Sequence, residues 1–421
     1  MKISTSALFL FTGVCLSASA PPGEPLTLAA ALATALQNNP SLQAYAFESR
    51  AAEALIEQAG FRPNPTLNVA LENFAGTGTH RGIDRLESTV QASQTLERGG
   101  KRDKRVTLAG RERDAAAKEY AVRRAEVLAT TAAAFVDTLA AQQRLALAAE
   151  PLKLARETVG AVDVRVKAAV ASPAESARAR AALAAAQAEY ARAEAGLLAA
   201  RLALAATWGG RPTDVPALSG QLHVPDALPA EEAFLGNISG HPRLDLQATV
   251  VSGRRAALDL EHAQAVQDVT VGGGVRFLRD GSDAAFVAGV SVPLPVRNRN
   301  QGNIRAARET LAGAEQTARA VEIGLRTAFT AAWQDLKAAH TVAQNLRHDA
   351  LPATEEAYAV VRGAYERGVL PLIDVLDAQR ALVALRRELL GAEAAYVAAF
   401  ARIAALTDPA YTTVTTLISQ P

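Results

Sequence analysis

The sequence predicts a mainly α-helical fold with a small β part, built from two tandem copies of one unit. Three observations support this prediction. Ala, Leu and Val carry most of the hydrophobic content of 49%, and aromatic residues make up only 5%, a composition that favours long, closely packed helices. Two long stretches favour helix and contain one proline each. Four segments of about ten residues alternate between apolar and polar side chains, as strands with one apolar face do.

The composition excludes several classes of protein. The chain of 421 residues carries 44 Lys and Arg against 43 Asp and Glu, a net charge of +1, so no overall basic field attracts nucleic acid. Its one Cys and one Met exclude a disulfide framework and a sulfur-rich metal site. After residues 1–20, no run of about eighteen uninterrupted apolar residues predicts a helical membrane span.

Residues 1–20 predict a signal peptide. Lys2 supplies a positive start, an apolar stretch opens at Ala7, and small residues suited to cleavage end at Ala20, which together form an export signal. We expect cleavage after Ala18 or Ala20. Cys15 leaves lipid attachment open as an alternative, although the residues before it fit a lipobox poorly.

One pattern occurs twice, over 21–210 and over 230–408. The motif Asn39-Pro40-Ser41-Leu42 recurs as His241-Pro242-Arg243-Leu244, and the later parts of the copies align at an offset of about 198 residues. The proline-rich segment 211–229 joins the copies as a linker, and 409–421 forms a C-terminal tail. The expected helices are 41–62, 98–168 and 173–208 in the first copy, and 241–266, 303–368 and 372–406 in the second. The expected strands are 66–74, 86–96, 269–278 and 285–294.

The long helices 98–168 and 303–368 exceed the width of a globular domain. At 1.5 Å per residue the first spans about 105 Å. Pro151 and Pro352 should each kink a long helix without ending it, because each removes one backbone hydrogen bond. Two shorter helices stacked end to end match one long helix, so the pattern favours a tall cylinder wall. A soluble spectrin-like rod has the same helical pattern and stays open as an alternative.

Each strand segment has one apolar and one polar face. In 86–96, Val90 and Leu96 point to one side and Glu87 and Gln91 to the other. The segments are long enough to cross a bilayer as tilted strands. Four strands cannot enclose a lumen, because the smallest such barrels have about eight. The pattern therefore predicts either a soluble sheet packed on a core, or a barrel shared by two, three or more identical copies.

Three stretches resemble one protein family. Stretches 96–102 and 292–304 resemble the two strand-to-helix junctions of the TolC-type outer-membrane efflux channels, and 369–379 resembles their periplasmic helix turn. The most specific stretch, 292–304, reads Val-Pro-Leu-Pro-Val-Arg-Asn-Arg-Asn-Gln-Gly-Asn-Ile. The chain is most similar to the branch that serves heavy-metal cation pumps (CzcC-like), and the resemblance covers nearly the whole mature chain.

The resemblance implies a homotrimer whose strands form a shared twelve-stranded transmembrane β-barrel in outer-membrane lipid, above a long α-helical coiled-coil barrel in the periplasm. It implies a passive exit duct of a tripartite efflux system, which receives heavy-metal cations from an inner-membrane, proton-driven pump of the RND type and its periplasmic adaptor protein. Such a protein is not an enzyme. Two alternatives stay open: the same channel fold exporting drugs or organic solutes, and a secreted helical rod or adaptor protein.

Asp374 and Asp377 are candidate residues of the periplasmic aperture. They lie three residues apart on one helix and point the same way, so in a trimer they would form two carboxylate rings, as cation-favouring pores do. The alternative is that they are carboxylates of the first helical turn, favoured by the helix dipole, and the two roles are compatible.

The resemblance also assigns residues around the turn that precedes these acids. Tyr365 and Gly368 match the family's closing contacts. The family often carries a basic residue two positions after this glycine, where this chain has Leu370, and Arg367 can substitute for it. In the first copy, Val170 stands where Gly368 stands. The tip turns that would dock an adaptor comprise Ser172, Pro173, Ala174 and Glu175 in the first copy, and Leu370 and Pro371 in the second.

No other pattern points to a reaction or to a bound metal. The six histidines lack the close spacing of a metal site. The run Gly272-Gly273-Gly274 lies inside an expected strand instead of before a helix, so it is no phosphate loop. No Gly-x-Ser-x-Gly motif frames a nucleophile. We therefore predict no catalytic residue, no cofactor and no metal site.

Overall fold

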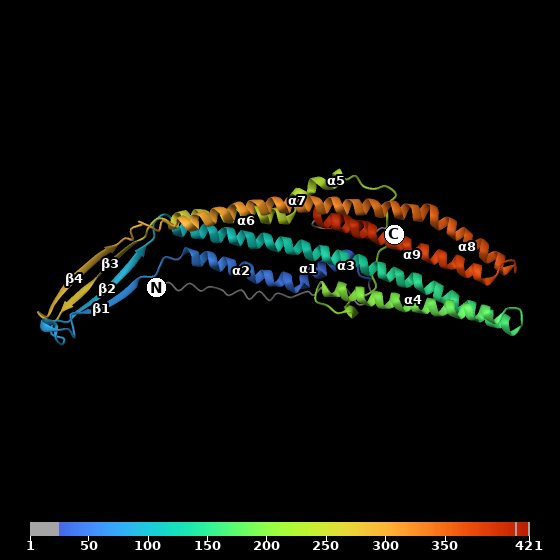
Figure 1. The fold of residues 1–421 in the computed structure, drawn as a ribbon, viewed down its shortest axis with the longest axis horizontal. Helices are drawn as coiled ribbons and strands as arrows, with labels where there is room; N and C mark the ends of the chain where they lie inside the picture. Colours follow the sequence, from blue (N-terminus) through green and yellow to red (C-terminus); the bar gives the residue numbers. More distant parts are fainter. Residues whose placement is uncertain (1–24, 409–410, 420–421) are drawn as a thin grey trace, which may run out of the picture. The chain divides into compact units, whose positions relative to one another are not determined.

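The computed structural model describes residues 25–408 and 411–419. The predicted signal peptide and Cys15 lie outside the described residues. The described chain divides into two compact units. We call one the strand unit, formed by Ser41–Glu126 and Ala230–Ala331, and the other the hairpin unit, formed by the residues up to Pro40, Val127–Pro229 and the residues from Ala332 onward. Figure 1 labels the helices and strands of both units.

Helices and strands follow one another in the order helix, strand pair, long helix and shorter helix in each half of the chain. The helices are α1 (Leu28–Asn38), α2 (Pro40–Gly60), α3 (Lys101–Lys167), α4 (Pro173–Ala206), α5 (Glu232–Leu235), α6 (Pro242–Gln264), α7 (Gln301–Asn345), α8 (Leu351–Glu366), α9 (Leu372–Thr407) and α10 (Thr412–Ser419). The strands are β1 (Thr66–Glu72), β2 (Glu87–Leu96), β3 (Val269–Leu278) and β4 (Asp283–Ser291).

The structure differs from the predicted bounds at several element ends: β1 ends at Glu72 instead of 74, and α3 begins at Lys101 instead of 98. β4 ends at Ser291 instead of 294, because Pro293 has no N–H to donate to a strand ladder. The helix predicted over 303–368 contains a π-helical turn at Leu346–Ala350. The tail 409–421 contains the short helix α10.

The two prolines of the long helices act differently. Pro151 lies inside α3, which continues as one helix of 67 residues, as predicted. Pro352 lies in the first turn of α8, directly after the π turn, and the helical segment continues without a break from α7 through that turn into α8, so Pro352 does not end it, as predicted. A proline ring presses on the carbonyl four residues before it and removes a donor, and the wider π turn accommodates both effects.

The strand unit contains one antiparallel sheet in the order β1-β2-β3-β4. The register places Thr89 opposite Arg276, and Val90 opposite Val275, so polar and apolar side chains fall on separate faces. Side-chain hydroxyls meet across the polar face, with Thr95 Oγ1 3.2 Å from Thr270 Oγ1. β1 and β4 are the two edges of this sheet.

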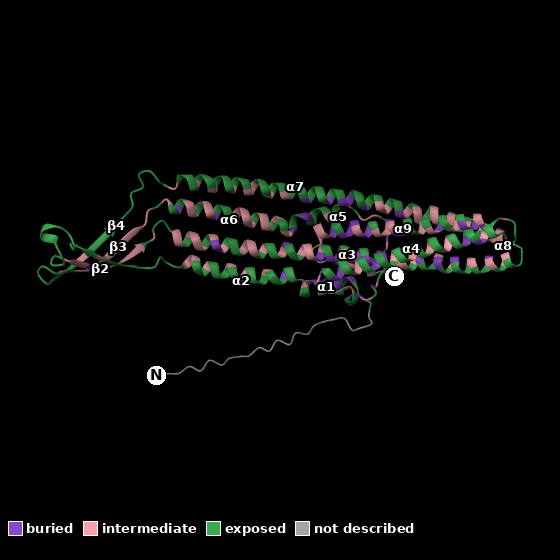
Figure 2. Cartoon of the chain, turned by 60° about the horizontal axis from the view of Figure 1, so that its bottom comes forward, coloured by how far each residue is buried: buried purple, intermediate pink, exposed green. Residues whose placement is uncertain are grey.

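The hairpin unit has an apolar helical core. α9 contributes many of the buried residues, among them Tyr396 and Ile403, and Figure 2 colours its buried residues purple. Among the described helices, α9 alone is long and apolar enough to cross a membrane by length and composition, and 56% of its most apolar stretch is buried. The burial fits a core helix.

Side chains of the hairpin unit hold the predicted linker 211–229 in place. Gln142 of α3 binds Leu218 twice, through Nε2 to the carbonyl and through Oε1 to the N–H, each at 3.0 Å. From α7, His340 Nε2 lies 2.9 Å from the carbonyl oxygen of Pro225, and Gln344 donates to the same oxygen. The linker therefore has fixed contacts to the long helices, as its backbone groups require.

Candidate functional site

In this sheet the apolar face is exposed and the polar face is more covered, which is the reverse of a soluble sheet. On the apolar face Phe286 is 94% exposed, and Leu67 and Val290 are each 72% exposed. On the polar face Thr89 is only 7% exposed. Figure 2 shows β4 as largely exposed. A sheet packed on a core buries its apolar face, so the soluble-sheet alternative is wrong for this unit.

Both edges of the sheet are open. β1 and β4 each pair with one neighbour, and no further strand of the described chain lies beside either of them. An open edge presents a row of unpaired N–H and C=O groups, which is a template for another strand. Open edges combined with an exposed apolar face make this sheet an incomplete structure in water and in lipid alike.

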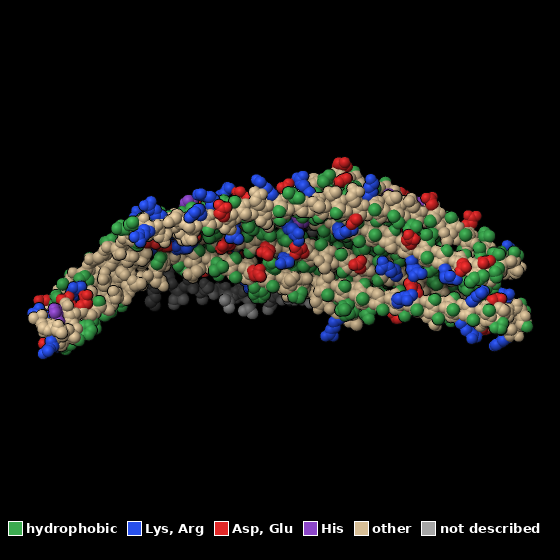
Figure 3. Space-filling view, viewed as in Figure 1, with side chains coloured by type: hydrophobic (Ala, Val, Ile, Leu, Met, Phe, Trp, Pro, Cys, Tyr) green, Lys and Arg blue, Asp and Glu red, His purple; other side chains and the backbone are tan. Residues whose placement is uncertain are grey.

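An ion-pair cluster lies on the polar face near the hairpin loops. Arg276 of β3 donates to Glu87 Oε2 at 3.0 Å and to Thr89 Oγ1 at 3.1 Å, and its guanidinium lies 3.5 Å from Glu72 of β1. Three adjacent strands are thereby cross-linked on one face. Beyond them, charged side chains gather on the loops (Figure 3), where Arg85 and Asp280 lie 3.5 Å apart.

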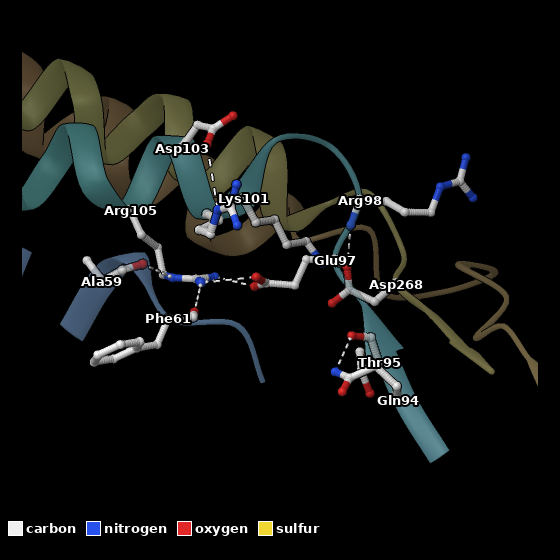
Figure 4. Close-up of polar contacts among 11 residues, drawn as sticks. Ala59, Phe61, Gln94, Thr95, Glu97, Arg98, Lys101, Asp103, Arg105 and Asp268 are labelled. Atoms are coloured by element: carbon white, nitrogen blue, oxygen red, sulfur yellow. Dashed lines mark hydrogen bonds and ion pairs between the residues drawn. The ribbon is translucent and has the colours of Figure 1, made fainter. Parts of the chain in front are cut away.

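At the other end of the strands, Arg105 of α3 ties a strand-to-helix junction together (Figure 4). Its guanidinium makes a two-pronged ion pair with Glu97, which follows β2. It also donates to the carbonyl oxygens of Ala59 and Phe61, at the end of α2. The hydrogen bond to Glu97 raises the pKa of Arg105, and burial opposes this only in part. The planar guanidinium suits such a multidentate contact.

Asp268, the residue directly before β3, connects the start of β3 to the same junction. Its Oδ1 accepts from the backbone N–H of Arg98 at 3.0 Å and from Lys101 Nζ at 2.8 Å. Burial acts to raise the pKa of Asp268, but the hydrogen bonds from Lys101 and from the Arg98 N–H outweigh it and hold that pKa below its ordinary value. The entrance to β3 is therefore fixed to the exit of β2 by a charged hydrogen-bonded pair.

In the hairpin unit, the turn between α8 and α9 has the geometry of a Schellman cap. Gly368 has φ +77°, and its N–H donates to Tyr365 O at 2.8 Å. The N–H of Val369 donates to Ala364 O at 2.9 Å. A left-handed residue at this position favours glycine, which explains why Gly368 is here. Arg367 is the last residue before it and is exposed.

Tyr365 contacts the other helical hairpin through a residue that the sequence did not identify. Arg165 of α3 donates from Nη1 to the Tyr365 hydroxyl at 2.7 Å, and its guanidinium lies 5.4 Å from the ring centroid. The ring also packs against a buried cluster at the start of α9 that includes Leu372 and Leu376, together with Val162 of α3. The position of Arg165 near the end of α3, close to the turn into α4, is the sequence signal that could have suggested this contact.

The two acids at the start of α9 differ in their contacts. Asp374 is in the first turn of α9 and is partly buried, where the helix dipole favours a carboxylate. Asp377 is exposed and lies 2.5 Å from Arg380, one turn further along. The structure thus places both on the first two turns of α9, close to Tyr365 and Gly368 in the chain.

The turn between α3 and α4 corrects the predicted alignment by one residue. Ala169, with φ +57°, takes the left-handed position of Gly368, so the prediction that Val170 stands there is wrong. Ser172 begins α4 with a capping box to Glu175, and Pro371 is the corresponding residue before α9. The offset is therefore 199 in the turns. Alanine adopts this left-handed conformation less readily than glycine does. The pattern of apolar and polar residues in the sequence does not indicate which residue adopts it.

Two consecutive arginines of α9 link the α8–α9 helical hairpin to the α3–α4 helical hairpin, further from the turns than Tyr365. Arg386 lies 2.8 Å from Glu355 of α8 and 3.6 Å from Glu150 of α3. Arg387 lies 2.7 Å from Glu189 of α4. The hydrogen bond from Arg192 and the charge of Arg387 lower the pKa of Glu189 against the effect of burial. Together with Arg165, these pairs connect all four helices of the tip.

The described residues hold no group of three or more His, Cys, Asp or Glu side chains that could bind a metal ion. Individual histidines have structural contacts instead: His241 Nδ1 accepts the backbone N–H of Arg243 at 3.1 Å and begins α6. Burial, with the nearby charge of Arg243, lowers the pKa of His241. The charged clusters thus connect strands and helices.

Comparison with known proteins gives one consistent result. A family model described as outer membrane efflux protein matches residues 31–210 and 242–408. The cobalt-zinc-cadmium resistance protein CzcC of Cupriavidus metallidurans is 33% identical over 87% of this chain and 86% of its own length. The nickel and cobalt resistance protein CnrC of the same organism is 32% identical over 74% of this chain and 72% of its own length.

Solved structures share the fold. The crystal structure of the outer membrane protein VceC from Vibrio cholerae has a TM-score of 0.73 over 90% of this chain and 96% of that chain, at 19% identity. The structure of CusC has a TM-score of 0.74 over 90% of this chain and 92% of that chain, at 16% identity.

Proposed function

Because the chain belongs to the outer membrane efflux protein family, and is an outer-membrane protein with a periplasmic helical extension, we propose that three copies form one passive exit duct. Each copy gives its four strands to a shared barrel of twelve strands in the outer membrane. The helices of the three copies form a coiled-coil barrel in the periplasm. The duct performs no reaction and only offers solutes a path out of the cell.

The exposed apolar face of the sheet carries this proposal. Phe286, Leu67 and Val290 are exposed on that face, and lipid is the surrounding that suits them. In lipid the open edges of β1 and β4 must be paired, because each unpaired backbone group there costs several kcal/mol. Pairing β4 of one copy with β1 of the next closes the sheet without any other protein.

The separate matches of the two halves of the chain support two tandem repeats, 21–210 and 230–408. The family model matches 31–210 and 242–408 as two segments. In a trimer of such a chain, every strand pair of the barrel lies between two similar strand pairs. The contacts between copies then resemble the contacts between the two halves of one copy.

Heavy-metal cations are the proposed cargo. The relatives at 33% and 32% identity are named as cobalt-zinc-cadmium and nickel-cobalt resistance proteins. Within the described residues no cluster of metal-binding side chains is present, so the cations would pass as hydrated ions and the choice of cargo would lie with the pump. Drugs or organic solutes are the alternative cargo for the same duct. The secreted rod or adaptor protein does not agree with the family assignment.

The partners would be an RND-type pump in the inner membrane and a periplasmic adaptor protein. The two tip turns are the proposed docking surface for the adaptor. Their residues are mostly exposed in the single chain and form helix starts with fixed geometry, Ser172 through its capping box. The docking residues are Ser172, Pro173, Ala174, Glu175, Leu370 and Pro371.

The proposed aperture lies beside these turns. Asp374 and Asp377 would form two carboxylate rings around the axis of the trimer and favour cations. Tyr365, with its hydrogen bond from Arg165, would hold the two hairpins of one copy in the closed arrangement. Gly368 gives the turn its shape, and Arg367 places an exposed positive charge next to it.

Conductance in a planar lipid bilayer tests the duct. The purified protein in detergent should insert and give stepwise, ion-conducting openings with a preference for cations. A protein that never conducts, and that stays soluble without detergent, would contradict the proposal.

Growth of a deletion strain tests the cargo. Loss of the gene should reduce growth on zinc, cadmium, cobalt or copper and leave tolerance to drugs unchanged. The reverse pattern would support the alternative cargo while leaving the duct intact.

A further inference from the structure

We propose that Asn64 of one copy caps the β4–α7 turn of the neighbouring copy, in the way that Asp268 caps the β2–α3 turn within a copy. The partner is a second copy of this chain, and the inference rests on the shared barrel proposed above. It assigns a specific polar contact to the seam between copies, at the junction of strands and helices.

The internal contact provides the template. Asp268 lies directly before β3, and its Oδ1 accepts hydrogen bonds from the Arg98 N–H and from Lys101 Nζ. The side chain of Lys101 is only 13% exposed. One carboxylate therefore fixes the turn that leads from β2 into α3 and, at the same time, the entrance to the adjacent strand.

The two turns before the long helices share the backbone conformation of the residue directly before the helix, although Gly99 is also left-handed and the corresponding Arg299 is not. Gly100 directly precedes α3 with φ +70°, and Asn300 directly precedes α7 with φ +62°. The carbonyl oxygen of each accepts the N–H four residues later at 3.0 Å, Lys104 in the first case and Ile304 in the second. This match puts Asn298 in the place of Arg98 and Gln301 in the place of Lys101.

The two strand entrances also match. Thr66 of β1 is paired with Ser93 of β2, and Thr270 of β3 is paired with Ser291 of β4. Asn64 lies two residues before Thr66, as Asp268 lies two residues before Thr270. Asn64 therefore presents a side-chain oxygen at the position from which Asp268 caps its turn.

Closure of the barrel brings the β4–α7 turn of one copy beside the entrance of β1 of the next. In the sheet, the exit of β2 lies beside the entrance of β3. If β4 pairs with β1 of the next copy, the exit of β4 lies beside the entrance of that β1. In the single chain, residues 61–66 and 291–299 are all exposed. A hollow of about 550 Å³ lies at the β4–α7 turn and is lined in part by Gln267, Asn298 and Asn300.

The capping residue and its partner are both charged at the junction inside a copy, and both residues are neutral at the proposed junction between copies. Inside a copy, the negative Asp268 meets the positive Lys101. At the seam, the neutral Asn64 would meet the neutral Gln301, whose Oε1 accepts the Arg299 N–H at 2.7 Å and whose Nε2 donates to the Arg297 carbonyl oxygen at 3.1 Å within its own turn. A carboxylate without its cation would be costly to bury, and an amide pair with hydrogen bonds is not. The matched loss of both charges is the observation that carries the proposal furthest.

The seam is not a complete copy of the internal junction. Gly99 packs closely against Val266, and the corresponding positions hold Arg299 and Arg62. That close packing is not reproduced, so the proposal is confined to Asn64 and its turn.

Disulfide trapping tests the contact. The sole cysteine of the wild-type chain is Cys15, so Asn64→Cys combined with Asn298→Cys adds the only pair in the body of the protein. Oxidation of this double variant in outer membranes should give covalent dimers and trimers on a non-reducing gel. Each single variant should stay uncrosslinked, because a threefold arrangement does not bring a residue against its own copy.

The matched control is Arg98→Cys combined with Asp268→Cys. This pair should form a disulfide within one chain and no covalent oligomer. If an amine-reactive cross-linker joins wild-type copies into trimers but the Asn64→Cys/Asn298→Cys variant stays single, the proposed cap is wrong and the shared barrel stands. If the cross-linker finds only single copies, the shared barrel itself is wrong.

A charge exchange gives a second readout. Asn64→Asp alone should lower the temperature at which the trimer dissociates on a gel, because it places an unpaired carboxylate in the seam. Adding Gln301→Lys should restore or raise that temperature, since the pair then matches Asp268 and Lys101. An unchanged temperature in both variants would overturn the proposal.

Discussion

The sheet of the strand unit and the helices of the hairpin unit cover opposite kinds of side chain. In the hairpin unit, Phe135, Leu139 and Tyr396 are fully buried, as in any protein that folds in water. In the strand unit, Phe286 is exposed and Thr89 is covered. The sheet and the helices use ordinary strand and helical periodicities, so the difference lies in the solvent for which each of these two parts is built. One chain is folded for lipid at its sheet and for water at its helices.

A charge on the exposed apolar face should have the largest effect. Phe286→Arg places a guanidinium where we expect lipid, at a cost of about 2–4 kcal/mol near the middle of a bilayer. We expect the heat-resistant oligomer to be lost from the outer-membrane fraction, as seen on unheated gels. Asn68→Arg, on the polar face of β1, is the matched control and should assemble. Equal assembly of both variants would remove the distinction between the two faces.

The junction below the strands should show the next largest effect. Arg105→Ala leaves Glu97 and two carbonyl oxygens without their donor, and we expect a loss of about 2 kcal/mol in the free energy of unfolding. Arg102→Ala is the control, because the side chain of Arg102 is 41% exposed and lies 3.9 Å from its neighbour Asp103. Denaturant unfolding in detergent measures both. Similar midpoints for the two variants would mean that the Arg105 contacts contribute little.

In the hairpin unit, the two tip turns offer a comparison within one molecule. Gly368→Ala forces alanine into the left-handed region and should cost about 1 kcal/mol. Ala169→Gly removes the same strain from the other turn and should be neutral or stabilising by up to about 1 kcal/mol. Thermal unfolding followed by circular dichroism gives both values. Destabilisation of similar size in both variants would show that the two turns are not equivalent.

The aperture acids should have the smallest effect on folding and a measurable effect on conduction. Asp374→Asn with Asp377→Asn removes both proposed carboxylate rings and should raise single-channel conductance or weaken the preference for cations. Asp377→Asn alone should do less, because Asp377 is already paired with Arg380. If the double variant conducts like the wild type, the two acids serve only the first turns of α9.

The sequence predicted the elements whose period is regular and missed contacts that depend on three-dimensional proximity. Alternation along 86–96 identified the two faces of β2, but not which face is exposed, because a soluble sheet has the same alternation. The contact between Arg165 and Tyr365 joins residues 200 positions apart, and the arginine near the end of α3 is a signal for a contact but not for its partner. The π turn before Pro352 and the left-handed Ala169 also carry no periodic signal, so the alignment of the copies was wrong by one residue at the tip.

The shared barrel is tested most directly by native mass spectrometry of the protein extracted from outer membranes in mild detergent. We expect a single assembly with the mass of three mature chains, which dissociates to single chains only on heating or strong activation. A species with the mass of one chain, obtained under conditions that preserve a known trimeric membrane protein, would contradict a barrel built from three copies.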